Sequence, residues 1–424
     1  MKDLYQKEHF FSHPKGKIAI FYPSYWVGTV HFLWDAARLL NENGYCVEFY
    51  FKHNPTDPIP DIAGMEIYIE DNQPAIFRGR GTKLPRWWLI KRGNNIYASV
   101  MSSIHNPFFR KKLLNRHRRL PYTCFIGIDQ EGLNEARKYA DYLNIPYIYW
   151  SFELAFLDEV KTKKEYEIKL IEIKDSRNAA FIIIQDEWRA NALVVENGLN
   201  PSKVHLVPNA PRGKARRSKN YALQKKLGIS LNKKIVLYAG HLGWWSMTRE
   251  VITAASSWPE EYMLLIQSRS RLNSKEFEEI KSYSNPNKVL ISTNPLNLVN
   301  YRELVDSADM GLALYNPCSG GQGKVLLKNL KILGYSSGKL ADYLWCGLPV
   351  IVNKDIIGPA ELINSFDCGV CVSTPQQIKE AIENIIKDYD RYVINTINCF
   401  NEKLELEKYF VPVIDSFNKL AAPK

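Results

Sequence analysis

Short apolar runs alternate with longer amphipathic stretches along the first half of the chain. The apolar runs have the length and composition of buried strands, and most of the stretches between them have the spacing of helices. The expected strands are Lys17–Ser24 with its closing loop, Cys46–Phe51, Tyr122–Gly127, Pro146–Phe152, Ala180–Gln185 and Val204–Val207. This order predicts a doubly wound parallel sheet, in which ligands bind at the carboxyl ends of the strands.

The alternation pauses over residues 213–230, which are basic and loop-like, and then restarts. The second series of expected strands is Lys234–Ala239, Tyr262–Gln267, Val289–Ser292, Met310–Leu314, Leu348–Val352 and Gly369–Val372. Because 424 residues are too many for one ordinary core, we expect an α/β protein with two Rossmann-like domains facing a cleft. We place the domains at 1–212 and 231–400, the linker at 213–230 and a terminal helix at 401–424.

The stretch with the most specific chemistry is Leu333–Val352, which predicts a loop, a short helix, a tight turn and a buried strand. Ser336 or Ser337 can cap the helix with a hydroxyl group, and Gly338 lets the backbone approach a ligand closely. Lys339 adds a positive charge where the helix dipole is already positive, so the sequence predicts a phosphate site. An ordinary capped helix is the alternative interpretation.

Asp342 lies one helical turn further on, where a carboxylate could accept two hydrogen bonds from a sugar diol. The whole segment closely resembles the donor-binding segment of the group 1 glycosyltransferases, which have the GT-B fold. The resemblance implies that Lys339 holds the nucleotide diphosphate, that Asp342 holds the ribose, and that Gly347–Ile351 is the strand that follows. The run Val207–Asn209 resembles the Val-Pro-Asn sequence that closes the first domain in that family. By the same resemblance, the terminal helix crosses back to the first domain.

The resemblance implies a hexosyltransferase-like glycosyltransferase. It would move a sugar from a nucleotide-diphosphate sugar of the UDP or GDP type to a polysaccharide or lipid-linked glycan of the cell envelope. A fixed positive charge lowers the barrier to departure of the diphosphate, and Lys339 can supply this charge without a metal ion. We therefore expect no other cofactor and no metal site, and the resemblance implies a retaining outcome.

Three positions depart from the family pattern. The acid that usually faces the donor sugar falls on Gly334, and the Arg and Lys that often follow the first strand of the second domain fall on His241 and Ser246. The sugar contacts, the subfamily and the stereochemical outcome therefore stay open.

Further candidate residues occupy loops that follow strands or begin helices. On the donor side they are Gly240, His241, Arg249, Ser268 and Arg269, and on the acceptor side Gly28 and Thr29. If the enzyme inverts, a general base should come from the first domain. The candidates for this catalytic role are Glu153, Asp129, Glu131 and His105. For Glu153 the alternative is a helix-start carboxylate stabilised by the dipole, and for the basic donor-side residues it is a surface role.

The net charge of +11 and the pI near 9.1 favour an anionic partner. Residues 72–119 interleave Lys and Arg with Trp and Phe, a composition that suits contact with an anionic membrane surface. A solvated basic face with its aromatic side chains in the core is the alternative. No nucleic-acid motif stands out, so we expect no nucleic-acid partner.

The seven cysteines are scattered and odd in number, which favours reduced core thiols over a disulfide framework. Cys368 and Cys371 have the spacing of a metal or redox pair but lack a second pair. The N-terminus shows no secretory signal pattern, and no apolar run approaches 18 residues. We expect a cytoplasmic protein that binds peripherally to the inner face of the cell membrane.

Two other functions stay open. A nucleotide-sugar 2-epimerase shares the GT-B architecture, but it needs a set of acids in the cleft and no membrane patch. A degenerate GT-B module that binds a nucleotide sugar or a partner without turnover is favoured by the missing acid at Gly334. Donor turnover would exclude the binding module, and a requirement for an acceptor would separate the transferase from the epimerase.

Overall fold

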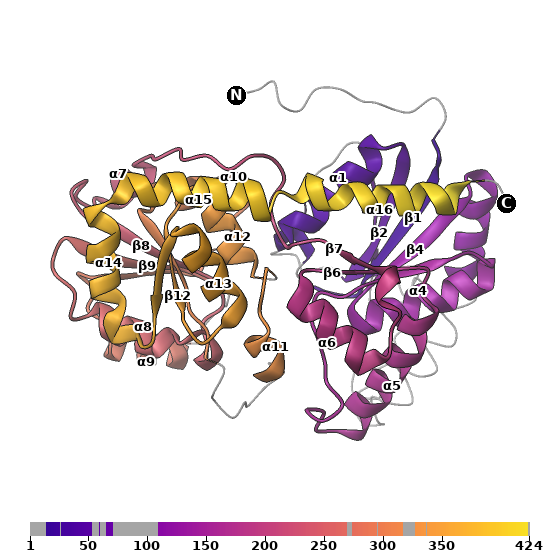
Figure 1. The fold of residues 1–424 in the computed structure, drawn as a ribbon, viewed down its shortest axis with the longest axis horizontal. Helices are drawn as coiled ribbons and strands as arrows, with labels where there is room; N and C mark the ends of the chain where they lie inside the picture. The colour runs from indigo at the N-terminus through magenta and orange to yellow at the C-terminus, as the bar shows by residue number, and fades with distance from the viewer. Residues whose placement is uncertain are drawn as a thin grey trace, which may run out of the picture.

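The computed structural model of the chain describes residues 14–25, 27–52, 59, 65–70, 109–268, 274–294, 296–316, 327–335 and 337–422. Two parallel sheets, each covered by helices, form two domains side by side (Figure 1). The predicted α/β class with two Rossmann-like domains is confirmed. The cysteines within the described ranges form no disulfide.

The N-terminal sheet has seven strands in the order β3-β2-β1-β4-β5-β6-β7. The strands are β1 (Gly16–Tyr22), β2 (Tyr45–Lys52), β3 (Met65–Glu70), β4 (Tyr122–Ile128), β5 (Tyr147–Trp150), β6 (Ile182–Ile184) and β7 (Val204–Leu206). The helices labelled here are α1 (His31–Glu42), α4 (Asp129–Leu143), α5 (Lys163–Asn178) and α6 (Glu187–Asn197), and a further helix ends at residue 119. Because helices cover both faces, the central strands are apolar on both sides, and every residue of β4 is buried.

The C-terminal sheet has six strands in the order β10-β9-β8-β11-β12-β13. The strands are β8 (Lys234–Ala239), β9 (Tyr262–Gln267), β10 (Val289–Ser292), β11 (Met310–Ala313), β12 (Val350–Asn353) and β13 (Gly369–Val372). The helices are α7 (Ala222–Leu227), α8 (Thr248–Ala255), α9 (Ser274–Ser282), α10 (Leu298–Ser307), α11 (Leu327–Lys331), α12 (Gly338–Trp345), α13 (Ile357–Phe366), α14 (Ile378–Lys387) and α15 (Tyr389–Lys403). Helix α7 lies within the segment predicted as linker and packs against α10.

The last helix, α16 (Leu406–Ala421), leaves the C-terminal domain and packs on the N-terminal sheet (Figure 1). Its apolar side places Leu406, Phe410, Val413 and Phe417 in the same core as β1, β2 and α1. The sequence predicts one terminal helix over 401–424, whereas the chain ends α15 at Lys403 and begins α16 three residues later. The break between α15 and α16 allows the chain to pass from one domain to the other.

Arg212, just before the predicted linker, ties the crossing point together. Its guanidinium lies 2.6 Å from Glu42 of α1 and 3.0 Å from Glu407 of α16, and its backbone N–H donates to Asp35 at 3.1 Å. The end of the N-terminal domain, its first helix and the last helix are therefore held together at one point.

Candidate active site

Helix α12 begins where the sequence predicts the phosphate site. Ser337 caps the helix by accepting a hydrogen bond from the N–H of Leu340 at 3.4 Å. The Ser337 hydroxyl also lies 2.5 Å from the hydroxyl of Tyr315, just beyond the end of β11. Of the two predicted caps, the structure uses Ser337, while Ser336 lies outside the described residues. Gly338 and Lys339 form the first turn.

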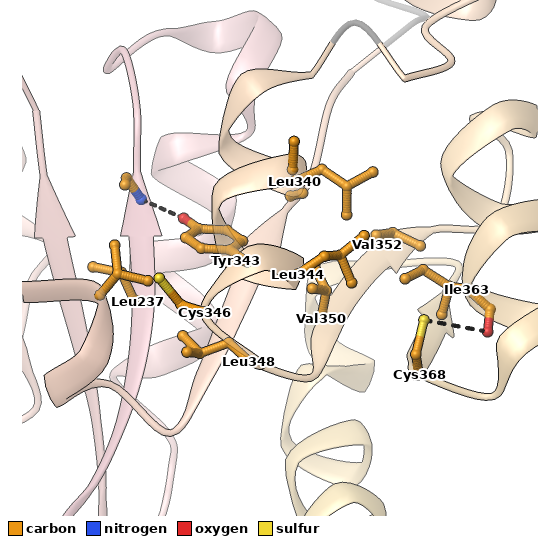
Figure 2. Close-up of a cluster of buried hydrophobic side chains, with 14 of the residues drawn as sticks. Leu237, Leu340, Tyr343, Leu344, Cys346, Leu348, Val350, Val352, Ile363 and Cys368 are labelled. Atoms are coloured by element: carbon orange, nitrogen blue, oxygen red, sulfur yellow. Dashed lines mark hydrogen bonds between the residues drawn. The ribbon is translucent and has the colours of Figure 1, made fainter. Parts of the chain in front are cut away.

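The underside of α12 fixes the helix to its sheet. Figure 2 shows Leu340, Tyr343 and Leu344 packed among buried side chains of the neighbouring strands. The N–H of Ala239 at the end of β8 donates to the Tyr343 hydroxyl at 2.7 Å. Gly311 makes room for this ring, because a Cβ at that position would lie 2.3 Å from it. The first turn of α12 therefore has a well-defined position above the carboxyl ends of β8 and β11.

Lys339 lies between two aromatic rings. Its ammonium is 4.4 Å from the ring centre of Tyr238 and 4.3 Å from that of Tyr315, an arrangement typical of cation–π contacts. The ammonium also donates to the Tyr238 hydroxyl at 3.4 Å. Among the described side chains, no carboxylate lies within ion-pair distance of Lys339. Burial without a counter-charge lowers the pKa of Lys339 to about 7.

Several other predicted donor-side residues lie near this ammonium. Asp342 is half-buried one turn further along α12, and Gly240 and His241 follow β8 directly. Burial and the charge of Lys339 lower the pKa of His241, so the two side chains belong to one electrostatic environment. Ser268 is buried at the end of β9, where its N–H donates to Ser292 at 2.8 Å.

A groove of about 520 Å³ adjoins these strand ends. Its lining includes Gln267 of β9, next to Ser268, and Ser292, Thr293 and Asn294 at the end of β10. The lining also includes Leu265 and Leu290, which pack in the same core as Leu340 of α12. The groove therefore lies on the same face of the sheet as α12.

One of the described donor-side predictions, Arg249, is not brought to this site. Arg249 is exposed on α8, where its guanidinium lies 3.9 Å from Glu279 and over the ring of Tyr283, so it faces α9. Arg269 lies outside the described residues.

Asp129 is the acid whose pKa changes most among the described residues of the N-terminal domain. It begins α4 with a left-handed backbone (φ 54°), which is rare for a residue with a side chain. One carboxylate oxygen accepts hydrogen bonds from the N–H groups of Phe152 and Glu153 at 2.7 and 2.9 Å. Burial, aided by the charge of Glu153, raises the pKa of Asp129 to about 7. Strain and a raised pKa together are typical of functional sites.

Glu153 points from the N-terminal domain toward the donor side. Its side chain is 73% exposed, and its carboxylate accepts a hydrogen bond from Asn329 of α11, across the boundary between the domains. Burial, with smaller effects from the charges of Tyr238 and Glu153, raises the pKa of Tyr315. Glu153 and Lys339 therefore come from different domains and both influence Tyr315.

Glu131 and Gly28 lie at the same edge of the N-terminal sheet. Glu131 is exposed in the first turn of α4 and lies 3.7 Å from Lys52 at the end of β2. Gly28 is buried in a short 3-10 turn, Val27–Thr29, whose first carbonyl accepts from the indole of Trp34 at 2.9 Å. The side chain of Thr29 and all of His105 lie outside the described residues.

Sequence reasoning missed Tyr238 and Tyr315, which enclose the lysine. Both lie at or just beyond the carboxyl end of a C-terminal strand, and that position is the signal that could have found them. Within the described ranges, no group of three or more His, Cys, Asp or Glu side chains is arranged to hold a metal ion. Metal independence stays a prediction. The described helices include none with the length and apolar character needed to cross a membrane.

Comparisons with known proteins agree with this picture. Residues 326–415, which include Lys339 and Asp342, match the family model described as the C-terminal domain of glucosyltransferase 3-like proteins. A search of curated proteins gave no match.

Similar solved structures extend over almost the whole chain. Sucrose-phosphate synthase from Thermosynechococcus elongatus has a TM-score of 0.66 at 15% identity, over 96% of this chain and 99% of that chain. HepE from Anabaena, solved in complex with UDP-glucose, has a TM-score of 0.61 at 14% identity, over 96% of this chain and 98% of that chain. A glycosyltransferase from Rickettsia africae has a TM-score of 0.63 at 11% identity, over 98% of this chain and 100% of that chain.

At these identities the structural matches establish the fold. The predicted GT-B fold is confirmed. The family-model match confirms the resemblance to nucleotide-sugar glycosyltransferases that the sequence indicated. The sequence predicts a glycosyltransferase, and both the family model and the similar solved structures belong to this class of enzyme.

Proposed function

We propose that this GT-B chain transfers a hexose from a nucleotide-diphosphate sugar to a glycan acceptor, without a metal ion and with retention at the anomeric carbon. The observation that carries the proposal is Lys339, a half-buried ammonium between two tyrosine rings at a helix N-terminus, with no described carboxylate beside it. A buried cation is unfavourable unless an anion accompanies it. A diphosphate would supply that anion, and the helix dipole would add to the attraction.

The spacing of the strands supports a nucleotide of this length. Lys339 lies over β8 and β11, and the groove lies at the ends of β9 and β10. Neighbouring strands are about 4.8 Å apart, so the groove begins roughly 10 Å from the ammonium. A nucleoside attached to the diphosphate would reach Gln267 and Ser292 in this groove. Asp342, one helical turn after Lys339, would accept hydrogen bonds from the ribose.

The proposed donor is a UDP-hexose, with UDP-glucose as the first probe. The HepE structure was solved with UDP-glucose, and the matching family model is described as glucosyltransferase 3-like. The sugar would face Glu153 and Asp129 across the boundary between the domains. Asp129 would keep Glu153 in place through its hydrogen bonds to the N–H groups of Phe152 and Glu153.

The proposed acceptor is a polysaccharide or lipid-linked glycan at the cytoplasmic face of the cell membrane. The described part of the basic stretch supports membrane contact, because the helix that ends at residue 119 exposes Lys111, Lys112, Arg118 and Arg119 while Leu113 is buried. Each exposed basic residue near an anionic surface contributes about 1 kcal/mol. Sedimentation with vesicles of phosphatidylglycerol and phosphatidylcholine tests this contact, which should weaken from 0.1 M to 0.5 M salt.

Donor turnover tests the function itself. Purified protein is mixed with UDP-glucose, other UDP-hexoses or GDP-hexoses, with and without a membrane fraction that supplies acceptor, and nucleotide release is measured. We expect release with one nucleotide series that depends on acceptor and falls at least tenfold in Lys339→Ala. NMR of the product then reports the anomeric configuration. Epimerised donor without acceptor would favour the 2-epimerase, and binding without turnover would favour the degenerate module.

A further inference from the structure

Asp186 and Gly334 lie against each other across the domain boundary. Asp186 belongs to the N-terminal domain, where it precedes α6, and Gly334 belongs to the loop that leads into α12. A Cβ on Gly334 would lie 2.5 Å from the nearest oxygen of the Asp186 carboxylate, closer than any non-bonded contact allows. This is the position where the resemblance leads us to expect an acid. A side chain at position 334 would therefore collide with the Asp186 carboxylate of the first domain, which explains why this position holds a glycine.

The two oxygens of Asp186 have separate tasks. Oδ1 accepts from the N–H of Arg189 at 3.0 Å and so caps α6. Oδ2 accepts from the N–H of Tyr335 at 2.8 Å and so holds the loop of the other domain. The carboxylate is only 2% exposed, so water competes little for either bond.

Other contacts hold the same loop from other sides. The N–H of Asn209, at the end of the N-terminal domain, donates to the carbonyl of Tyr335 at 3.3 Å. The ring of Trp188 meets the ring of Tyr335 edge to face, with 5.5 Å between centres. A Cβ on Gly358 of α13 would lie 2.6 Å from the Gly334 Cα, so α13 closes the loop from behind. Ser337, two residues after Tyr335, caps α12, and Lys339 lies in the first turn of this helix.

We propose that Asp186 is a positioning residue for the donor site, which sets the loop Leu333–Tyr335 and through it the Ser337 cap and the first turn of α12. This inference rests on the proposed function, because it assigns the N-terminal domain a role in donor binding by the C-terminal domain. The resemblance leads us to expect an acidic side chain at position 334 of the loop. In this protein the carboxylate of Asp186 reaches the loop from the other domain instead.

The variant Asp186→Asn separates the two tasks. Asn caps a helix as well as Asp does, so its oxygen can keep the bond to Arg189. Its amide group would then meet the N–H of Tyr335 with a donor instead of an acceptor. Thr162→Ala is the matched control, because it removes the cap of α5, where Thr162 accepts from Glu165 at 3.2 Å, far from the domain boundary. Circular dichroism and thermal unfolding verify that both variants are folded.

Calorimetric binding of UDP-glucose is the first measurement. We expect the Kd to rise at least tenfold in Asp186→Asn and less than twofold in Thr162→Ala, with the KM for acceptor unchanged in both. Gly334→Ala should also raise the Kd at least tenfold, since its methyl group displaces the carboxylate. When Asp186 is replaced by the shorter Ser, adding Gly334→Ala should raise the Kd by less than a further factor of three. Wild-type affinity in Asp186→Asn, or independent effects in the double variant, would overturn the proposal.

Hydrogen exchange separates a failure of this inference from a failure of the proposed function. If the wild-type protein binds neither UDP- nor GDP-sugars, the proposed function fails, but the contact of Asp186 can still be measured. The N–H of Tyr335 should exchange at least tenfold faster in Asp186→Asn than in the wild type and in Thr162→Ala. Unchanged exchange at Tyr335 would show that Asp186 does not hold the loop.

Discussion

The protonation of Lys339 should be coupled to donor binding. The fall of its pKa from 10.5 to about 7 corresponds to roughly 5 kcal/mol of lost preference for the charged form. In the ligand-free protein only about a tenth of the molecules then carry the charge at pH 8. A diphosphate beside the ammonium restores the charged form, so binding at pH 8 should take up close to one proton.

The affinity should follow the same linkage. Above pH 7 each pH unit should weaken binding by up to tenfold, because the lysine must first be protonated. The diphosphate of a nucleotide sugar stays doubly charged over this range, so the protein supplies the pH dependence. The pKa of His241 is lowered and its ring is neutral here, whereas Asp129 also titrates near pH 7. The variant Lys339→Arg measures any pH dependence that comes from Asp129, because an arginine stays charged over the whole range.

Titration calorimetry of UDP-glucose at pH 6.5, 7.5 and 8.5 measures both quantities. Repeating each titration in two buffers with different ionisation enthalpies gives the number of protons taken up. We expect uptake near one at pH 8.5 in the wild type, much less in Lys339→Arg, and a Kd that rises about tenfold or more from pH 6.5 to 8.5. A Kd constant within twofold, with no proton uptake, would refute the reasoning that places the diphosphate on Lys339.

Four further predictions concern single positions. Asp129→Asn should raise the melting temperature at pH 8, and this gain should disappear toward pH 4. The reason is that the native pKa of Asp129 is about 7, so the stability of the wild type falls as pH rises through 7. Transfer activity of the variant should fall at least tenfold. Glu153→Gln should lower kcat at least 100-fold, since its carboxylate would face the positive charge that develops on the donor sugar, and should leave the melting temperature unchanged, since the side chain is 73% exposed; unaltered kcat would remove it from catalysis. Tyr343→Phe should lower the free energy of unfolding by about 1–3 kcal/mol in denaturant titration, because the N–H of Ala239 loses its partner, and a neutral effect would contradict this. Arg249→Ala should leave the Kd for UDP-glucose within twofold of wild type, whereas a tenfold loss would return this residue to the donor site.

The strands and the phosphate-binding turn could be predicted from the sequence because both are local. A buried parallel strand is a short apolar run, and the turn before α12 needs a cap, a small residue and a cation within four positions. Leu340, Tyr343 and Leu344 have the spacing of a helix face that packs on a sheet. Lys339 lies one turn before Tyr343 on the side of the helix toward the strand ends, where the structure places its ammonium against Tyr238 and Tyr315.

The partners of Lys339 could not be predicted, because they depend on distances across the fold. Tyr238 lies 101 residues away in sequence, and it reaches the lysine only because β8 and β11 are neighbours in the sheet. The pair Asp186 and Tyr335 is separated by 149 residues and by a domain boundary. Arg249 shows the reverse case, because its place in the sequence suggested the donor site but the rotation of α8 turns it toward α9.

The stability of the ligand-free protein provides a separate argument that Lys339 serves a ligand. Because its native pKa is lowered, the native state binds fewer protons than the unfolded state between about pH 7 and 10.5. The loss of stability is therefore complete below pH 7 and is relieved as pH rises through this window. Lys339→Met keeps a similar volume without the charge, so it should raise the melting temperature most at pH 6.5 and little near pH 10. A lysine between two tyrosine rings costs stability that a methionine would not, and this fits a site in which function outweighs stability.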